Sequence, residues 1–367
     1  MMTRRIIPIV KAAAQGAVCV LLLVYAQGSR EGAAQGVRLC LSVLVPSLFP
    51  FMAVTQLFVH TGLCQRAGKV LHRPARALFG LSGAFAPVIL LCLVGGYPVG
   101  AGGIAALYRQ GAVSRREAER AALFAVCAGP GFVVSFVGAA VYGSRETGLV
   151  LFGAQSVSVL VTGIVSGLLC RSSEKDNSIS ENSSASLPFA QALVESVEGA
   201  SRGMLTICAF VVFFSSLTGI AAQLLPDGAA LDGLFLLTEV SGAVTRCADT
   251  RSVTAVAFAV GFGGLCIHCQ IFAALGEVRV SKPLFFLFRI IQGFLTAALT
   301  RLGLGLLPRT AAVFSTATAK EAAFCGGSIV SGAVLLGVMV CFLVTVKQTM
   351  PRGIWRGLRR RSGNNNL

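Results

Sequence analysis

The sequence predicts an all-α integral membrane protein with two inverted repeats and about eight full spans, each repeat holding a re-entrant hairpin and a broken transmembrane helix. Of its 367 residues, 55% are hydrophobic, and the mean hydropathy is +0.78. Only 13% are charged, against about 25% in a soluble domain. Apolar runs recur at the length of about 20 residues that a helix needs to cross a bilayer. Lipid cannot satisfy backbone polar groups, so such runs must be helical.

Ten apolar segments are visible along the chain. They are residues 12–27, 39–62, 84–108, 120–142, 148–170, 203–225, 231–247, 253–275, 284–307 and 328–347. The first could pass for a signal peptide, but Ala26-Gln27-Gly28 is a poor cleavage site. We therefore expect an uncleaved membrane helix there.

A polar, Ser/Asn-rich stretch at 171–187 predicts a flexible linker and divides the chain into halves. Each half has a long helix, a Gly-interrupted segment, a segment with a central Gly cluster, and a final helix. The predicted units are an N-terminal membrane helix (1–35), a first repeat (36–170), the linker (171–200), a second repeat (201–310), a C-terminal membrane helix (311–350) and a basic cytoplasmic tail (351–367).

Charge decides the predicted topology. The net charge is +16, but the 31 basic residues sit in short clusters between apolar runs, which is typical of membrane topology and not of nucleic-acid binding. If every segment crossed, the basic clusters at 66–76 and 109–120 would face opposite sides. If 84–108 dips in from the cytoplasm and 231–247 from outside, eight spans remain, with 21 basic residues inside and 8 outside. Both termini are then cytoplasmic, and the halves are inverted.

The broken segments predict a substrate site. Irregular backbone at membrane depth is tolerated only when it is buried in protein or lines a cavity, and matching breaks in two halves mark transporter sites. A Gly-rich packing seam or a simple proline kink at Pro130 is the alternative. The predicted substrate-binding residues are Gly95, Gly96, Tyr97, Pro98, Gly100, Gly129, Pro130, Gly131, Ser135, Glu239, Ser241, Gly242, Gly263, Gly264, His268 and Gln270.

Two polar residues in these segments have alternative interpretations. Glu239 stands alone in an apolar run, so it either binds a coupling proton or cation, or serves as a structural partner for an Arg or for backbone N–H groups. His268 lies within a Cys-x-x-Cys, but no second ligand pair exists, so we expect a cavity lining and no metal. No catalytic constellation or phosphate loop is present, so no enzyme activity and no cofactor are expected. The basic tail is expected to contact anionic lipid.

Five motifs, in order, carry a family resemblance. They are Val45–Phe51, Gly95–Ala101, Ala128–Phe132, Thr238–Gly242 and Gly261–Gln270. The set resembles the YlbJ-type sporulation integral membrane proteins. That family lies within the nucleoside recognition or Gate-domain group, which is similar to concentrative nucleoside transporters.

The resemblance implies two opposed hairpins beside two unwound helices. It also implies movement of dipicolinic acid from mother cell to forespore, across the mother-cell-derived outer forespore membrane. Dipicolinate is a small aromatic dianion, which suits the N–H groups at broken helix ends. One departure stands out, because no intramembrane Arg or Lys is clearly placed to neutralise a dianion. Arg202 and Arg289 are the nearest candidates, and an interfacial position suits both.

We therefore expect a secondary-transporter-like protein that moves a small anionic metabolite across the cell membrane. Its partners would be the substrate, membrane lipid and a coupling proton or cation, with no nucleic acid. The alternatives are a non-transporting scaffold or assembly factor in spore formation, and a nucleoside or cation transporter of the same fold. Substrate identity, coupling ion, direction and oligomeric state are not encoded in any motif we recognise.

Overall fold

The computed structural model describes residues 2–169, 187–249 and 252–306, and throughout these ranges the regular elements are helices. In chain order they are α1 (Met2–Val24), α2 (Ala26–Leu39), η1 (Cys40–Leu44), α3 (Val45–His60), α4 (Leu63–Phe79), α5 (Phe85–Gly95), α6 (Tyr97–Arg109), α7 (Arg115–Phe124), η2 (Gly131–Val141), α8 (Arg145–Leu169), α9 (Phe189–Leu224), α10 (Ala229–Thr238), α11 (Val240–Asp249), α12 (Val253–Phe262), α13 (Gly264–Leu275) and α14 (Lys282–Leu306).

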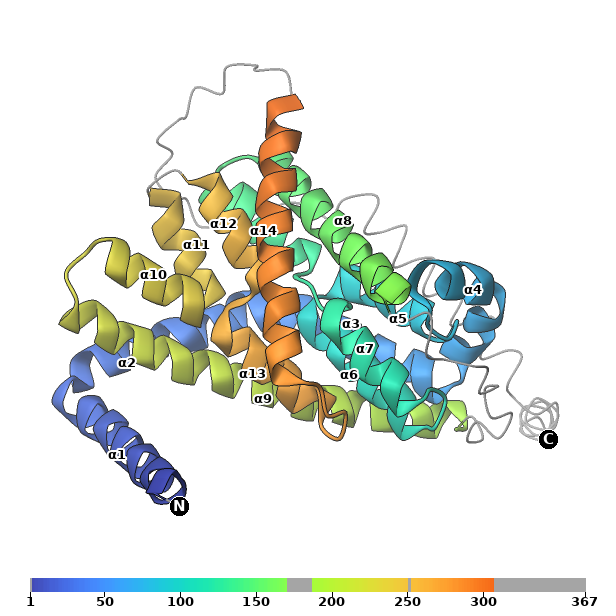
Figure 1. The fold of residues 1–367 in the computed structure, drawn as a ribbon, viewed down its shortest axis with the longest axis horizontal. Coiled ribbons are helices and arrows are strands. Elements are labelled where there is room, and N and C mark those ends of the chain that lie inside the picture. The colour runs from blue at the N-terminus through green and yellow to red at the C-terminus, as the bar shows by residue number, and fades with distance from the viewer. Residues whose placement is uncertain (1, 170–186, 250–251, 307–367) are drawn as a thin grey trace, which may run out of the picture.

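The first long helix of each half packs against the other. Elements α2, η1 and α3 form one continuous helix over 26–60, which runs across the predicted boundary at residue 35. This helix runs antiparallel to α9, with Gly28 beside Gly219 at one end and Gln56 beside Gly199 at the other (Figure 1). Small residues let two backbones approach closely in a membrane bundle. Helix α9 begins at Phe189, within the range 171–200 that was predicted as linker.

Both Gly-interrupted segments form helical hairpins. Helices α5 and α6 reverse direction at Gly96, where φ is +89°, and Val88 lies against Gly103 further down the hairpin. Helices α10 and α11 reverse at Glu239, whose backbone is extended, and Phe235 packs on Gly242. The predicted turns are confirmed at both places. Whether the hairpins are re-entrant in a bilayer stays a prediction.

Both Gly-cluster segments are broken helices, as expected. The first consists of α7, an irregular stretch at 125–130, and η2, which is a π-helix. The second consists of α12 and α13, and here Gly263 and Gly264 both have positive φ, at +90° and +71°. Only glycine adopts such a pair of conformations at low cost. The residues of the first break pack inside the main hydrophobic core, together with hairpin α5–α6.

The last helices of the two halves, α8 and α14, also cross antiparallel at the centre of the molecule (Figure 1). Gly303 lies against Val150 near one end of this pair, and Gln292 bonds Thr162 further along it. Thus both pairs of equivalent helices run in opposite directions. This arrangement supports the inversion of the repeats, which remains a prediction together with the number of spans.

Five helices of the described chain are long and apolar enough to cross a membrane. They are Ala26–His60, Arg145–Leu169, Phe189–Leu224, Val253–Leu275 and Lys282–Leu306. The expected span at 120–142 is divided by its break into pieces that are each too short. In the expected first span, the apolar helical part is limited to Gln15–Val24. The expected helix at 328–347 and the basic tail lie outside the described residues.

Candidate functional site

Hairpin α5–α6 touches the break of its own half. A Cβ placed on Gly96 would lie 3.1 Å from the backbone nitrogen of Gly129, so the two backbones are in close contact. Below the tip, the sulfur atoms of Cys92 and Cys127 lie 3.6 Å apart and are buried. The glycine-rich tip therefore serves the close backbone approach that its composition predicted.

Hairpin α10–α11 touches the break of the second half in the same manner. A Cβ on Gly264 would lie 3.2 Å from the carbonyl carbon of Thr238. Next to it, the buried carboxylate of Glu239 accepts hydrogen bonds from the backbone nitrogens of Ser241, at 2.9 Å, and Gly242. These N–H groups are the unpaired donors at the start of α11, so Glu239 caps this helix. These bonds fit the interpretation of Glu239 as a structural partner of backbone N–H groups, and its binding of a coupling ion stays a prediction.

Tyr97 connects the first hairpin to the second break. Its hydroxyl donates a hydrogen bond to the carbonyl oxygen of Val260, in the last turn of α12. Gly263 lies close by, since a Cβ placed there would be 3.6 Å from the Tyr97 hydroxyl. The first tip and the two breaks thus form one contiguous region, and Gly264 joins the second tip to it.

Arg289 lies at the centre of this region, and its side chain is 1% exposed. Its expected interfacial depth in the bilayer stays a prediction. Its guanidinium donates to the carbonyl oxygen of Val126 at 2.6 Å, in the first break, and to those of Gly261 and Phe262, at the second break. The guanidinium carbon lies 5.5 Å from the centroid of the Tyr97 ring. One cation therefore ties both breaks and one hairpin tip together.

Gln292, one turn along α14, extends the network. Its side-chain oxygen accepts from Arg289, and its amide nitrogen donates to the carbonyl oxygen of Phe124 at 3.3 Å and to the hydroxyl of Thr162 at 2.9 Å. Phe124 ends α7, and its carbonyl oxygen also accepts from the backbone nitrogen of Val126 at 2.8 Å. The side chains of α14 thus bond to carbonyl groups at the ends of the broken helices.

The predicted site residues differ in their surroundings. Those that are buried are Gly95, Gly96, Tyr97, Pro98, Gly100, Gly129, Glu239, Gly263, Gly264, His268 and Gln270. Pro130, Gly131, Ser241 and Gly242 are half-buried beside them. Ser135 is exposed on η2. That these residues bind a substrate stays a prediction.

His268 and Gln270 have local partners. The Nε2 atom of His268 lies 2.8 Å from the carbonyl oxygen of Phe262, which can only accept, so Nε2 carries the proton. Three phenylalanine rings pack edge-on against the imidazole ring, with centroids between 4.8 and 5.4 Å away. Gln270 donates to the Cys266 sulfur one turn earlier on α13. These contacts fit a packing role for both side chains.

Two further arginines pair with acids outside this region. Arg202 is exposed and forms a 2.6 Å ion pair with Glu198, so it is not placed to meet a substrate. Arg246, at the open end of hairpin α10–α11, donates to Asp227 and Asp232. Hydrogen bonds to Asp227 and then to Asp232 raise the pKa of Arg246, so it stays charged.

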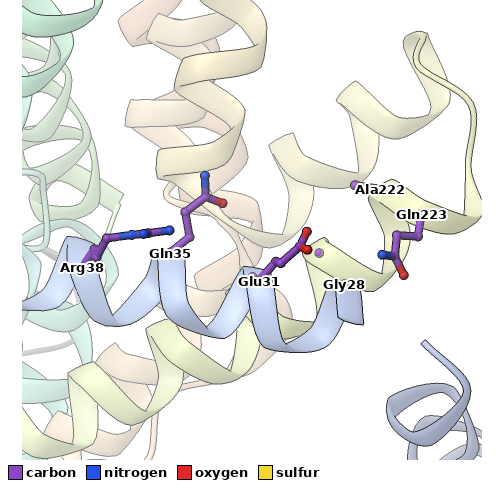
Figure 2. Close-up of a pocket in the computed structure, with 8 residues that line it drawn as sticks. Gly28, Glu31, Gln35, Arg38, Ala222 and Gln223 are labelled. Atoms are coloured by element: carbon purple, nitrogen blue, oxygen red, sulfur yellow. The ribbon is translucent and has the colours of Figure 1, made fainter. Parts of the chain in front are cut away.

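A separate hollow lies away from this region. It is a cleft of about 460 Å³ between α2 and α9. Glu31, Gln35 and Arg38 lie along α2 on one side of it, and Ala222 and Gln223 lie on α9 (Figure 2). None of the predicted site residues lines this cleft. Gly28, Gly32 and Gly219, at which the two helices are in close contact, also line the cleft.

Comparison with known proteins shows which proteins this chain is similar to. Residues 41–145, from η1 to the start of α8, match the Gate domain, described as nucleoside recognition. The chain is thus an integral membrane protein with a segment that is similar to the Gate domain. It is also similar to the sporulation integral membrane protein YlbJ of Bacillus subtilis (strain 168), with 25% identity over 316 residues that cover 75% of this chain and 78% of the relative. These findings confirm the family resemblance. No solved structure matches the chain significantly.

Proposed function

We propose that this protein is a secondary-transporter-like carrier of a small anionic metabolite, with dipicolinic acid as the first candidate. The observation that carries the proposal is Arg289. Its guanidinium is buried, and its hydrogen-bond partners in the described chain are neutral oxygen atoms. An ionisable residue inside a membrane bundle marks a substrate or ion pathway by default. A dianion brings the negative charge that the surroundings of Arg289 do not supply.

The position of Arg289 and the lack of space around it support the same proposal. Arg289 meets both breaks, and in transporters of inverted repeats the substrate binds where the repeats meet. The space around Arg289 has no room for even a water molecule in this conformation, so substrate entry requires a hairpin to move. The hairpins turn at single residues, Gly96 and Glu239, and hinges of this kind absorb domain motions. The coupling ion and the role of Glu239 in binding it remain part of this proposal.

The test is uptake of radiolabelled dipicolinate by proteoliposomes that contain the full-length protein. Arg289→Gln keeps polarity and much of the volume but removes the charge, so we expect uptake to fall by about 100-fold, as for loss of one buried charge partner. Arg289→Lys keeps the charge and should retain part of the activity, although it cannot reproduce four hydrogen bonds. Arg202→Gln is the matched control, because Arg202 is exposed and paired locally.

The scaffold alternative has an observation in its favour, since Arg289 also serves as a structural tie between two breaks. It predicts no uptake by the wild-type protein for dipicolinate or for a nucleoside such as uridine. It also predicts that Arg289→Gln lowers thermal stability without any transport phenotype. Uptake of uridine with no uptake of dipicolinate would instead favour a nucleoside carrier. Equal dipicolinate uptake by wild type and Arg289→Gln would refute the role given to Arg289.

A further inference from the structure

Helix α4, which is not among the five possible spans and lies at the edge of the molecule, has three different faces (Figure 1). One face is buried and holds small and apolar residues: Cys64, Gly68, Ala75 and Phe79. The second is exposed and basic, with residues three or four positions apart: Arg66, Lys69, Arg73 and Arg76. The third is exposed and apolar: Val70, Pro74, Ala77 and Leu78. Packing inside the protein explains only the first face.

The basic face and the apolar face adjoin along the helix. Val70, Pro74 and Ala77 each follow a basic residue by one position, which places them about 100° further around the helix axis. Val70 is 82% exposed and Leu78 is 46% exposed. A helix on which an apolar stripe borders a stripe of Lys and Arg is typical of the membrane surface, where the apolar stripe sinks toward the acyl chains.

The protein holds α4 in this orientation at both ends. A Cβ placed on Gly68 would lie 2.6 Å from the backbone nitrogen of Ala84, so the two backbones touch just before hairpin α5–α6. At the other end, the guanidinium of Arg120 donates to the carbonyl oxygens of Phe79, at 3.1 Å, and Gly80. Helix α4 therefore cannot turn its apolar face toward the protein without losing these contacts.

The charge of the basic face is not neutralised by the protein. Helix α4 contains no Asp or Glu. Three of its basic side chains form no ion pair within the described chain: Arg66, Lys69 and Arg73. The 2.9 Å hydrogen bond between Gln65 and Gln110 brings the neighbouring loop, with exposed Arg109, to the start of α4. Basic clusters of this kind beside a membrane attract acidic lipid headgroups.

We propose that α4 is an interfacial helix that binds acidic phospholipids in the leaflet on its own side of the membrane. The basic face contacts lipid phosphate groups, and the apolar face lies among the upper parts of the acyl chains. The apolar face favours lipid over a soluble acidic partner, which would leave Val70 and Leu78 in water. Because α4 packs against the residues that precede hairpin α5–α6, bound lipid also fixes the base of this hairpin. The inference is independent of the transported substrate.

The first experiment measures thermal unfolding of the full-length protein in detergent micelles, with a thiol-reactive fluorogenic dye that reports exposure of buried cysteines. Phosphatidylglycerol, phosphatidylcholine or inorganic phosphate is added at equal phosphate concentration. A ligand that binds only the folded state raises the midpoint, and we expect a rise on the order of 3 °C with phosphatidylglycerol alone. The triple variant Arg66→Gln/Lys69→Gln/Arg73→Gln should lose most of this rise.

The matched control is Arg38→Gln/Arg145→Gln/Arg301→Gln, which removes the same charge. All three arginines are exposed, and the predicted topology places them outside, on the side opposite α4. We expect the control to keep the full response to phosphatidylglycerol. Equal responses in the two triple variants, whether kept or lost, would overturn the proposal. An equal rise with phosphatidylcholine would do so too, and an equal rise with inorganic phosphate or heparin would assign the basic face to soluble anions instead.

The second experiment locates the apolar face and leaves the rest of the basic face in place. Lys69 and Leu78 are nine positions apart, so they lie on opposite sides of the helix. Each is replaced in turn by a single cysteine in a variant whose native cysteines are replaced, and a fluorophore is attached to it in proteoliposomes. We expect nitroxide-labelled acyl chains to quench the label at position 78 more strongly, and aqueous iodide to quench the label at position 69 more strongly. Equal quenching at the two positions, or the reverse order, would place the apolar face in water and contradict the proposal.

Discussion

At the scale of single residues, the glycines around the breaks have unequal roles. Gly96 turns the first hairpin with a φ of +89°, and a Cβ there would press on the backbone of Gly129. Gly131 begins η2 with ordinary backbone, and a Cβ there would lie 3.4 Å from Cβ of Ser47, an ordinary contact. A glycine-rich motif in the sequence does not distinguish these two cases, whereas backbone conformation does.

This difference predicts that a glycine-to-alanine substitution has a large effect at one of these positions and a small effect at the other. Gly96→Ala should lower stability by about 1–2 kcal/mol, the cost of a left-handed backbone for a residue with a side chain, and should abolish dipicolinate uptake. Gly131→Ala should change the stability and the dipicolinate uptake only slightly. Thermal midpoints and uptake assays on the two variants measure this. A Gly131→Ala protein as damaged as Gly96→Ala would show that open space around a glycine does not predict tolerance here.

The same scale shows why the burial of Arg289 among the helix breaks was not predicted. The breaks and Glu239 were found because Gly, Pro and an isolated acid are conspicuous in an apolar run. Arg289 lies seven residues after Lys282, near the start of its segment, where an interfacial position is the ordinary expectation. The available signal was the stripe of Arg289, Gln292, Thr296 and Thr300 on one helix face, which only a buried polar surface requires. The capping bonds of Glu239 depend on the hairpin turn and have no signal in the sequence.

At the scale of elements, close helix contact depends on glycine spacing. Gly28, Gly32 and Gly36 repeat every four residues along α2 and face α9, where Gly219 meets them. A Cβ on Gly32 would lie 2.1 Å from the carbonyl oxygen of Ser215, a distance that no contact tolerates. The sequence reasoning predicted both long helices but not their pairing, because pairing is a property of two segments about 190 residues apart.

Gly32→Ala should therefore force α2 and α9 apart. We expect a destabilisation of about 1–3 kcal/mol, as for overpacking of a close interface. Gly153→Ala is the control, because Gly153 is exposed on α8 and has no atom within 4 Å of an added Cβ. Unfolding midpoints of the purified variants measure the difference. Equal midpoints for the two variants would mean that α2 and α9 are not in contact in the membrane.

At the scale of the whole molecule, hydrogen bonds and packing contacts hold the basic loops close together at one end. Gln65, at the start of α4, bonds Gln110 after hairpin α5–α6 at 2.9 Å, and the backbone nitrogen of Leu187 bonds the carbonyl oxygen of His60 at 3.2 Å. Gly167, near the end of α8, packs against Phe79 of α4. The charge count predicted that these segments share one side, since short basic loops remain in the cytoplasm. Hairpin α5–α6 makes this possible, because it returns the chain to the side from which it came.

The orientation of the whole molecule is therefore testable by labelling. Single cysteines at Lys69 and Arg116, both exposed in the structure, are placed in a variant whose twelve native cysteines are replaced. Both should be protected from a membrane-impermeant maleimide in intact cells and should react after permeabilisation. A cysteine at Glu146, exposed at the beginning of α8, should react in intact cells, because η2 carries the chain to the opposite end. If position 116 reacts in intact cells while position 69 does not, the segment at 84–108 crosses the membrane completely. The positive-inside argument, the inversion of the repeats and the re-entrant hairpin would then all be wrong, since each requires positions 69 and 116 on one side.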